Sequence, residues 1–319
     1  MALPEEIRTL RVVDRRELTG DTIELELEPA DGRSLPAWEP GAHIDLRLGS
    51  DMIRQYSLLP SRSREDTWTV AVLVEEQGRG GSRLIAETLQ IGSRVKVSGP
   101  RNHFPFGGGG PYLFIAGGIG ITPFLAMCRA AEASGAEWRL DYLGRSRESM
   151  PYVDELVAEF GEHIELRISG EAARLDVRAE IAASPMTTQV YCCGPDRLMD
   201  EVEALMSEER IEYAHLERFR PRDADQSENF EFTVYAAASD IEFVVPADES
   251  ILMAADFEGV VVPGDCLEGT CGSCETRVLL GAVEHRDSVL SLAQRRESAT
   301  MMICVSRAKP GTDRLELDL

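Results

Sequence analysis

The sequence lacks any long hydrophobic run. No segment of its 319 residues approaches the roughly 18 consecutive apolar residues of a membrane-spanning helix. Residues 1–8 also lack the apolar stretch that a secretory signal peptide carries. We therefore expect neither secretion nor a membrane partner.

Positive charge is scarce as well. The chain has 33 Lys and Arg against 56 Asp and Glu, a net charge of -23. Because such a surface repels phosphates, we expect no nucleic-acid partner. Residues 225–319 hold 18 acidic and 7 basic residues, a net of -11. This acidity could steer the chain onto a basic partner or could simply keep it soluble, and both interpretations remain open.

Cysteines are few and follow no disulfide framework. Their count of 7 is odd, which suits a reducing compartment, so we expect the protein in the cytoplasm. The 43% hydrophobic and 28% charged residues are ordinary for a globular protein. The length predicts two or three domains, each with its own core.

Four of the cysteines form a recognisable pattern. Cys266, Cys271 and Cys274 have the spacing Cys-x4-Cys-x2-Cys, and Cys304 follows about thirty residues later. Plant-type [2Fe–2S] clusters are ligated in this way. A structural zinc site, which usually joins two short cysteine pairs, or two disulfides would be the alternatives. The pattern favours the cluster.

The glycines of the same loop agree with this interpretation. Three thiolates close together in the sequence must converge on two irons, so the backbone has to turn tightly around the sulfur atoms. Gly264, Gly269 and Gly272 would permit positive or otherwise strained φ values and leave N–H groups free to point at sulfur.

The first third of the chain reads as a β-structure. Alternation of apolar and polar residues predicts half-buried antiparallel strands, with Gly and Pro between them. These strands are expected at residues 23–27, 44–48, 67–74 and 94–97. A small antiparallel β-barrel or sandwich is therefore predicted.

Two short motifs stand out in this region. The first, Arg54-Gln-Tyr56-Ser57, is expected to follow a strand, and the second, Gly-Arg-Gly-Gly-Ser, occupies residues 78–82. Either motif alone is compatible with an ordinary strand end or an ordinary glycine-rich turn.

The second motif leads into a predicted helix at residues 83–89. Ser82 could cap this helix, and Gly80 and Gly81 would expose N–H groups at its start, where anions bind. A phosphate bound there could also pair with the planar guanidinium of Arg54.

The middle third predicts a dinucleotide-binding fold. Residues 111–116 form a continuous apolar run, typical of a buried parallel strand, and lead through Gly118 and Gly120 into a helix at 124–133. The glycines would let a pyrophosphate approach the helix start. We expect Thr122 to cap this helix and Pro123, which replaces the third glycine of the usual fingerprint, to occupy its first position.

The next predicted strand, residues 138–144, ends at a basic loop. Arg145, Ser146 and Arg147 occupy positions where an acidic residue would bind a ribose 2′-hydroxyl. Ser146 and Arg147 could instead receive a 2′-phosphate, which favours NADPH slightly over NADH. The loop could equally be an exposed basic loop without this role.

A further strand ends at Cys193, followed by Gly194, Pro195 and a helix at 196–206. By itself Cys193 would be an ordinary buried cysteine. Cys128 and Cys192 are assigned to packing.

These motifs, in this order, resemble those of the phthalate dioxygenase reductase family, which belongs to the ferredoxin-reductase superfamily. The resemblance covers the whole chain and includes residues 102–106, which match the segment that closes the family's flavin domain. In that family R-x-Y-S contacts the flavin and G-R-G-G-S binds the phosphate of FMN. The resemblance thus implies FMN rather than FAD.

The resemblance also assigns roles near the nicotinamide. It places Cys193 beside the reactive carbon, where a small side chain leaves room for the ring. Residues 215–219 match the family's H-x-E-x-F segment, in which Phe219 would cover the flavin and Glu217 would orient the nicotinamide side.

The last third resembles a plant-type ferredoxin. After a polar linker at residues 221–229, the pattern predicts a hairpin, a short capped helix, a strand after the cysteine loop and two final strands. Their positions are 230–235 with 242–246, 250–256, 276–281, 304–308 and 315–319.

The expectation is a multidomain fold. It comprises an antiparallel β-barrel for FMN (1–107), an α/β Rossmann-like NAD(P)-binding domain (108–224) and an α+β β-grasp [2Fe–2S] ferredoxin domain (225–319). The resemblance implies a monomeric NAD(P)H-dependent reductase. It would pass electrons through FMN and the cluster to a terminal oxygenase, either Rieske-type or a cytochrome P450, in aromatic or xenobiotic hydroxylation or demethylation. A redox carrier or sensor without NAD(P)H turnover is the alternative.

Overall fold

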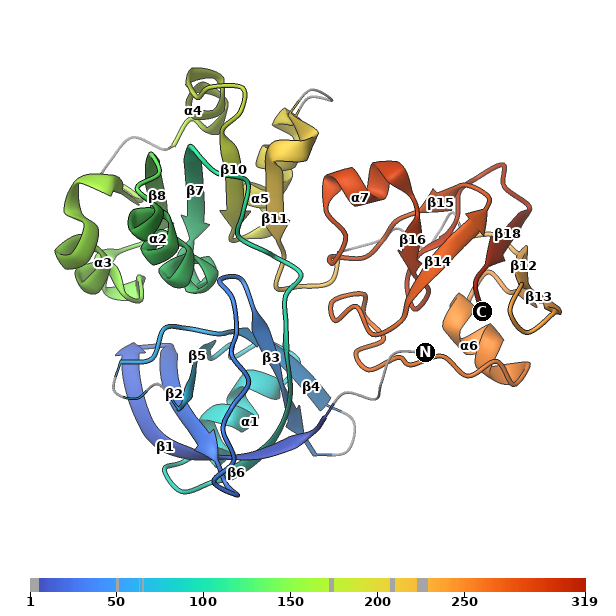
Figure 1. Cartoon of the computed structure of the whole chain (residues 1–319), viewed down its shortest axis with the longest axis horizontal. Helices are drawn as coiled ribbons and strands as arrows, with labels where there is room; N and C mark the ends of the chain where they lie inside the picture. The colour runs from blue at the N-terminus through green and yellow to red at the C-terminus, as the bar shows by residue number, and fades with distance from the viewer. Residues whose placement is uncertain are drawn as a thin grey trace. The chain divides into compact units, whose positions relative to one another are not determined.

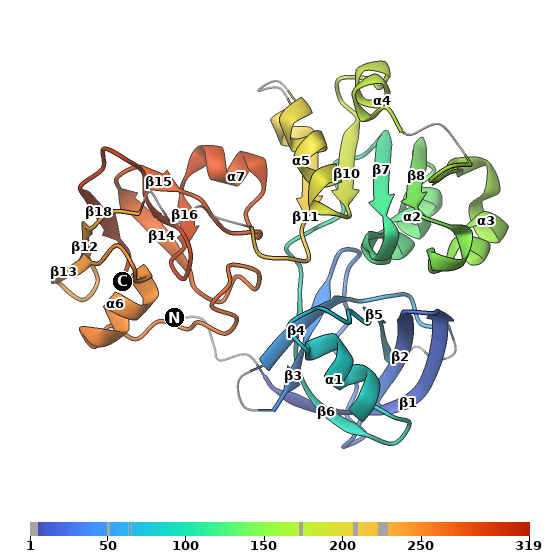
Figure 2. The same ribbon diagram turned by 180° about the vertical axis from the view of Figure 1, so that it is seen from behind.

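The computed structural model describes residues 6–49, 52–62, 64, 66–171, 175–206, 210–222 and 229–319. The chain divides into two compact units, Met1–Glu217 and Arg218–Leu319. Figures 1 and 2 show the elements from opposite sides. Most of the predicted linker, residues 223–228, lies outside the described residues, and so does the predicted boundary at 224/225.

The first unit begins with an antiparallel barrel sheet. Its strand order among the described residues is β4-β3-β6-β1-β2-β5. The strands are β1 (Arg8–Thr19), β2 (Thr22–Pro29), β3 (His43–Leu48), β4 (Met52–Ser57), β5 (Trp68–Leu73) and β6 (Arg94–Arg101). The helix α1 (Gly81–Thr88) packs against β3 and β4, as Figure 2 shows. Leu10, Leu25 and Leu46 are fully buried in the core between them, so apolar burial holds the barrel together.

The expected half-burial of the barrel strands is wrong for β2, β3 and β5, whose residues are buried along most of their length. Glu24 and Glu26 of β2 are buried together with their apolar neighbours, and so is Asp45 of β3. Thr67 donates a hydrogen bond to Glu26 (Oγ1–Oε1 2.7 Å), and Arg101 forms an ion pair with Asp45. Side chains from distant parts of the chain therefore cover the outer face, which strand alternation cannot reveal.

The second half of this unit is a parallel sheet covered by helices on both faces. Its order in the described part is β11-β10-β7-β8-β9. The strands are β7 (Tyr112–Gly117), β8 (Trp138–Gly144), β9 (Ile164–Ile168), β10 (Gln189–Cys193) and β11 (Ala214–Glu217). The α-helices are α2 (Thr122–Ser134), α3 (Val153–Phe160), α4 (Val177–Ala183) and α5 (Asp196–Leu205). The 3-10 helices are η1 (Gly118–Ile121), η2 (Arg147–Ser149), η3 (Gly161–His163) and η4 (Ile211–Tyr213).

Two separate cores flank this sheet. Phe114 and Leu140 pack with α2 and α3 on one face, whereas Ile115 and Val190 pack with α4 and α5 on the other. In Figure 1 α2 lies in front of the sheet, and in Figure 2 α5 does. Alternate residues of β7 thus point into different cores, which explains its uninterrupted apolar sequence. The predicted α/β fold is confirmed.

The second unit is a mixed α+β fold. Its main sheet, in the described residues, has the order β13-β12-β18-β14-β16, and β15 pairs with β17. The strands are β12 (Phe232–Ala236), β13 (Ile241–Val245), β14 (Glu275–Leu280), β15 (Val283–Glu284), β16 (Thr300–Met302), β17 (Arg307–Ala308) and β18 (Arg314–Leu317). The helices are α6 (Ile251–Phe257) and α7 (Leu292–Glu297). Strands β12 and β18 are parallel, whereas β12 and β13 form the predicted hairpin.

The short helix α6 begins where the sequence predicts. Ser250 is its N-cap and accepts a hydrogen bond from the Met253 amide (N–Oγ 3.2 Å). No helix in the described residues is long and apolar enough to cross a bilayer.

Candidate functional site

The first motif follows β3, as expected, and itself lies within β4. Successive residues of a strand point to opposite faces, so Arg54 and Tyr56 share one face and Ser57 lies on the other. Burial raises the pKa of the Tyr56 phenol, which therefore stays neutral. Ser57 is buried at the end of the strand.

The structure brings Arg54 against the second motif. A Cβ atom at Gly81 would lie 2.5 Å from Arg54 Nε, so only glycine leaves room for the guanidinium there. Gly80 has a φ of 85°, a left-handed conformation that favours glycine. Arg54 Nη1 also donates to the Ile53 carbonyl (2.7 Å). The two motifs thus form one local arrangement.

Ser82 does not cap α1, so this prediction is wrong. The helix begins two residues earlier, at Gly81, with Gly80 as its N-cap and no side-chain cap hydrogen bond among the described residues. Ser82 Oγ instead accepts a hydrogen bond from the Glu75 amide (3.0 Å) and ties the preceding loop to the helix. The helix N-terminus beside Arg54 therefore keeps backbone amides that could donate hydrogen bonds to a phosphate.

The glycine-rich turn joins β7 to α2 through η1. Gly118 has a positive φ of 56°. A Cβ at Gly120 would collide with the Cys193 carbonyl oxygen at the end of β10, so this position requires glycine. The turn is therefore held directly beside the next strand of the sheet.

Thr122 does not cap α2, which corrects the second capping prediction. The helix starts at Thr122 itself, with Ile121 as N-cap. Thr122 Oγ1 donates to the Ile119 carbonyl (3.1 Å) and lies 3.5 Å from Ser57 Oγ. Both hydroxyls are buried, so a residue of the barrel motif and a residue of the glycine-rich turn lie side by side.

Cys193 and Glu217 are neighbours on adjacent strands. They are register partners in the parallel pair β10–β11, and Cys193 is buried. Burial raises the pKa of the Cys193 thiol, and the adjacent Glu217 raises it further. The thiol is therefore neutral and serves as a small side chain and not as a nucleophile.

Burial also raises the pKa of Glu217 to about 8. The residue is partly exposed, but its Oε2 is buried and has no hydrogen-bond partner among the described residues. A buried carboxyl oxygen without a hydrogen-bond partner lowers the stability of the folded protein. We therefore infer that this position could bind a polar group of a ligand.

Gly194 and Pro195 lead from β10 into α5. Pro195 is the N-cap, and a Cβ at Gly194 would lie 3.0 Å from the backbone of Gly117. The end of β10 is therefore packed against the start of the glycine-rich turn.

The basic loop after β8 is already internally bonded. Ser146 and Ser149 form a capping box around η2, and Arg147 Nη2 forms an ion pair with Asp154 (2.6 Å). Arg145 is exposed. A 2′-phosphate would thus compete with Asp154 for Arg147.

Phe219 belongs to the second unit, and its side chain is 44% exposed. Its predicted role over the flavin therefore remains a prediction from the sequence.

The cysteine loop of the second unit has the strained backbone that the motif requires. Gly269 and Gly272 have φ values of 69° and 77°. Leu267 also has a positive φ, 57°, which is uncommon for a bulky residue and was not expected from its type. Gly264 lacks a positive φ, but a Cβ there would lie 2.5 Å from Leu252 Cδ2.

The sulfur atoms in this loop receive hydrogen bonds from the backbone. The Glu268 and Thr270 amides donate to Cys266 Sγ at 3.3 and 3.4 Å. Hydrogen bonds from the Cys271 and Cys304 thiols lower the pKa of Cys266. A thiolate that is stabilised in this way suits an iron–sulfur cluster.

Cys274 also contacts Cys304, so all four predicted ligands converge. Cys271, Cys274 and Cys304 are buried, and Cys266 is partly exposed. No three His, Cys, Asp or Glu side chains of the described residues are arranged around a single metal ion. The fit to a cluster therefore rests on the convergence of the thiols and on the amides directed at sulfur.

Asp287 supports the loop and was not predicted. It is buried, and its Oδ1 accepts hydrogen bonds from the Val289 and Leu290 amides (2.9 and 2.7 Å). The next residue, Ser288, donates its amide to the Gly269 carbonyl (2.8 Å). An Asp that bonds amides two and three residues later is a local turn signal, and it was available in the sequence.

Comparison with known proteins agrees with both halves of the site. A family model described as an oxidoreductase FAD-binding domain matches residues 9–106, and one for a 2Fe-2S iron-sulfur cluster binding domain matches residues 234–309. The chain is 39% identical over 301 residues to phenoxybenzoate dioxygenase subunit beta of Ectopseudomonas oleovorans, covering 94% of this chain and 93% of that protein.

Solved structures also resemble the whole chain. Phthalate dioxygenase reductase, described as a modular structure for electron transfer from pyridine nucleotides to [2Fe-2S], matches with a TM-score of 0.68 and 34% identity, with 98% of each chain covered. An intact type IV self-sufficient cytochrome P450 monooxygenase matches with a TM-score of 0.88 and 38% identity. That match covers 98% of this chain but only 41% of the P450 chain.

The fold, the flavin-domain and cluster-domain matches and the converging cysteines define an iron–sulfur flavoprotein oxidoreductase. The identity to relatives along nearly its full length specifies the group further. The chain belongs to the phthalate dioxygenase reductase family of oxygenase reductases.

Proposed function

We propose that this chain is an NAD(P)H-dependent reductase that delivers electrons through FMN and a [2Fe–2S] cluster to a terminal oxygenase. The observation that carries the proposal is the contact between Ser57 and Thr122, 3.5 Å apart. It places the flavin motif of the barrel beside the glycine-rich turn of the nucleotide fold, as hydride transfer between the two cofactors requires.

The barrel would hold the flavin as FMN. Arg54 and the free amides at the start of α1 would bind its terminal phosphate, and Gly80, Gly81 and Ser82 shape that helix start. Tyr56 and Ser57 would line the ring. When bound, the flavin accepts two electrons from a nicotinamide and releases them one at a time.

The parallel sheet would hold the nucleotide. Gly118 and Gly120 would admit the pyrophosphate to the start of α2, with Thr122 beside it. Arg145, Ser146 and Arg147 would receive a 2′-phosphate, which makes NADPH the preferred donor in this proposal.

At the end of β10, Cys193 and the residues Gly194 and Pro195 would leave space for the nicotinamide. Glu217 would orient its carboxamide. Because burial raises the pKa of this carboxyl to about 8, it is mostly protonated at neutral pH and can donate as well as accept a hydrogen bond. Phe219 would cover the flavin in the absence of nucleotide.

Cys266, Cys271, Cys274 and Cys304 would ligate the cluster. The amides of Glu268 and Thr270 would tune its potential through their bonds to Cys266 Sγ. The three predicted domains, 1–107, 108–224 and 225–319, would each hold one cofactor.

The acceptor would be a terminal oxygenase. The relatives named above include a dioxygenase subunit and a P450 monooxygenase, so the acceptor of this chain is proposed as either a Rieske-type oxygenase or a cytochrome P450. The acidic charge of residues 225–319 would favour a basic docking surface on that partner.

An anaerobic stopped-flow experiment tests the proposal. The FMN- and cluster-loaded protein is mixed with NADPH or with NADH, and the flavin absorbance is followed. We expect rapid bleaching of the flavin. At limiting nucleotide concentrations, bleaching should be faster with NADPH than with NADH. If neither nucleotide bleaches the flavin, the chain is a redox carrier or sensor without NAD(P)H turnover, and the reductase proposal fails.

A further inference from the structure

A buried tyrosine connects the glycine-rich turn to the segment that follows the basic loop. Tyr142 of β8 is fully buried, and its hydroxyl lies 3.2 Å from the Gly118 carbonyl and 3.0 Å from the Pro151 carbonyl. The hydroxyl has one proton for two acceptors, so it is shared between these backbone groups. Gly118 belongs to the proposed pyrophosphate turn, and Pro151 follows the loop that carries Arg145 and Arg147.

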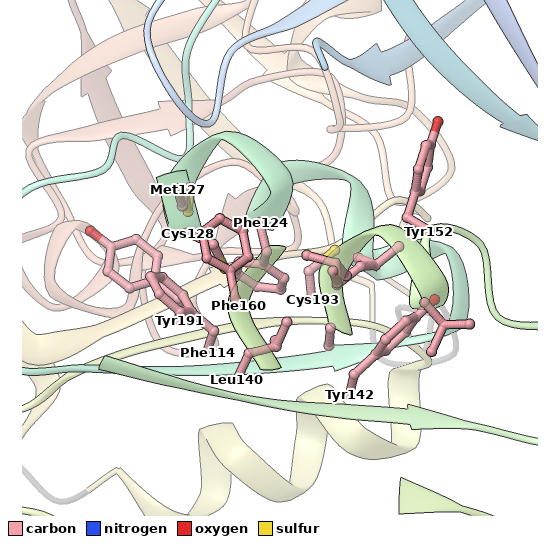
Figure 3. Close-up of a cluster of buried hydrophobic side chains, with 14 of the residues drawn as sticks. Phe114, Phe124, Met127, Cys128, Leu140, Tyr142, Tyr152, Phe160, Tyr191 and Cys193 are labelled. Atoms are coloured by element: carbon pink, nitrogen blue, oxygen red, sulfur yellow. The ribbon is translucent and has the colours of Figure 1, made fainter. Parts of the chain in front are cut away.

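A second tyrosine extends this connection to the barrel. Tyr152, the residue after Pro151, donates its hydroxyl proton to Glu24 Oε2 of β2 (2.6 Å). Tyr152 is 6% exposed and Glu24 is 7% exposed. In Figure 3 both tyrosines lie at the same end of the aromatic cluster, and the hydroxyl of Tyr152 points away from Tyr142.

The backbone of Tyr152 is strained in a way that fits a positional role. Its φ is 65°, and a bulky residue in the left-handed region is a genuine exception. The surrounding contacts must hold this conformation. It directs the ring out of the nucleotide fold and toward β2.

Charges on both sides stabilise the contact. Arg16 forms an ion pair with Glu24 and donates a hydrogen bond to its Oε2 (Nη2–Oε2 3.3 Å). Arg16 also reaches Glu155 of α3 (Nη1–Oε1 3.4 Å). Arg62 of the barrel forms a second ion pair with Glu155. The negative charges of the two carboxylates are therefore balanced by the positive charges of the two guanidiniums. A buried carboxylate such as Glu24 requires this compensation.

We propose that Tyr142 and Tyr152 are positioning residues for hydride transfer. Through their hydroxyls they fix the glycine-rich turn and the basic loop relative to the flavin-binding barrel. A nucleotide bound to these loops is thereby held at the position and in the orientation that hydride transfer to the flavin requires. This inference rests on the proposed function. It goes further because it assigns kinetic roles to two side chains that contact neither cofactor in that proposal.

The two substitutions should differ in their effects on the limiting rate of flavin reduction and on the Kd for NADPH. Tyr152→Phe removes the bond to the barrel but leaves the nucleotide-binding loops intact. We expect the limiting rate of flavin reduction to fall about tenfold, with the Kd for NADPH within twofold, because small misplacements of reacting groups slow a reaction strongly. Tyr142→Phe frees the glycine-rich turn itself, so we expect it to raise the Kd as well.

The test is anaerobic stopped-flow of the full, cofactor-loaded chain over a series of NADPH concentrations. Tyr235→Phe is the matched control, because this tyrosine of β12 also loses a bond to a carboxylate (Asp240, 2.8 Å) but lies in the second unit. It should leave both constants unchanged. Thermal unfolding of each variant reports any loss of stability.

The proposal is overturned if Tyr152→Phe and Tyr142→Phe keep both constants within twofold of the wild type. It is also overturned if the variants lose only thermal stability, because the tyrosines would then serve folding alone. Failure of the wild type to bleach with NADPH would instead remove the proposed function, and the two failures are thus distinguishable.

Discussion

At the scale of single residues, the missing side chain at Gly81 sets the position of Arg54. The Cβ of an alanine would lie 2.5 Å from Arg54 Nε and would displace the guanidinium from the start of α1. The φ of Gly81 is not positive, and alanine favours a helix over glycine by about 1 kcal/mol. The change should therefore leave the fold intact and affect the proposed phosphate site specifically.

We predict that Gly81→Ala raises the Kd for FMN about tenfold or more, since a charge-assisted hydrogen bond contributes roughly 1.5–3 kcal/mol. Fluorescence titration of the flavin-free protein with FMN measures this. Gly20→Ala is the control, because a Cβ there meets no atom within 4 Å. Equal affinities of the two variants would remove Arg54 from the phosphate site.

Glu217 gives a prediction on pH. Burial raises the pKa of this carboxyl from 4.5 to about 8, so the folded state binds its proton more tightly than the unfolded state. Its contribution to stability is fully present below pH 4.5 and is lost as the pH rises toward 8. Glu217→Gln, which cannot ionise, should therefore gain stability relative to the wild type across this window, by up to a few kcal/mol.

Urea midpoints measured between pH 4.5 and 9 test this expectation. The difference between the variant and the wild type should grow up to about pH 8 and then level off. A difference that does not change with pH would mean that Glu217 is solvated and titrates normally.

At the scale of elements, the basic loop after β8 yields a prediction on nucleotide choice. Arg147→Gln removes the charge that a 2′-phosphate would use, so the KM for NADPH should rise about tenfold with little change for NADH. Arg129→Gln is the control, because Arg129 is similarly exposed and, like Arg147, pairs with an acidic residue of α3, in this case Glu159.

Steady-state reduction of a one-electron acceptor with each nucleotide measures both KM values. A parallel rise for NADPH and NADH would show that Arg147 stabilises the loop through Asp154 and does not select the nucleotide.

The sequence predicts elements well where their own pattern determines them. The apolar run of β7, the hairpin β12–β13 and the Ser250 cap of α6 depend on nearby residues, and the structure confirms them. The convergence of Cys266, Cys271 and Cys274 was likewise readable from spacing, because these three ligands share one tight loop, whereas Cys304 comes from a distant part of the chain.

The errors arise where a competing partner, near or distant in the sequence, decides the outcome. Ser82 and Thr122 have the right side chains for caps, but Glu75 and Ile119 take their hydrogen bonds. Glu24 alternates like an exposed strand residue, yet Tyr152, 128 positions away, covers it. The pairing of Glu24 with Tyr152 cannot be read from local sequence, since it exists only once the sheets have packed.

At the scale of the whole molecule, the chemistry is divided between the two units. The first unit holds the flavin motif, the glycine-rich turn and the Cys193–Glu217 pair, whereas the second holds the four cysteines. Hydride chemistry and one-electron delivery should therefore be separable by a change in one unit only.

The Cys304→Ser variant tests this central claim most directly. In one set of anaerobic stopped-flow experiments, the wild type and the variant are mixed with NADPH, and flavin bleaching and reduction of a one-electron haem-protein acceptor are followed separately. The account predicts that the variant keeps the wild-type rate of flavin bleaching and loses most of its electron delivery. Loss of flavin bleaching together with delivery, or full delivery without Cys304, would contradict the electron path proposed here.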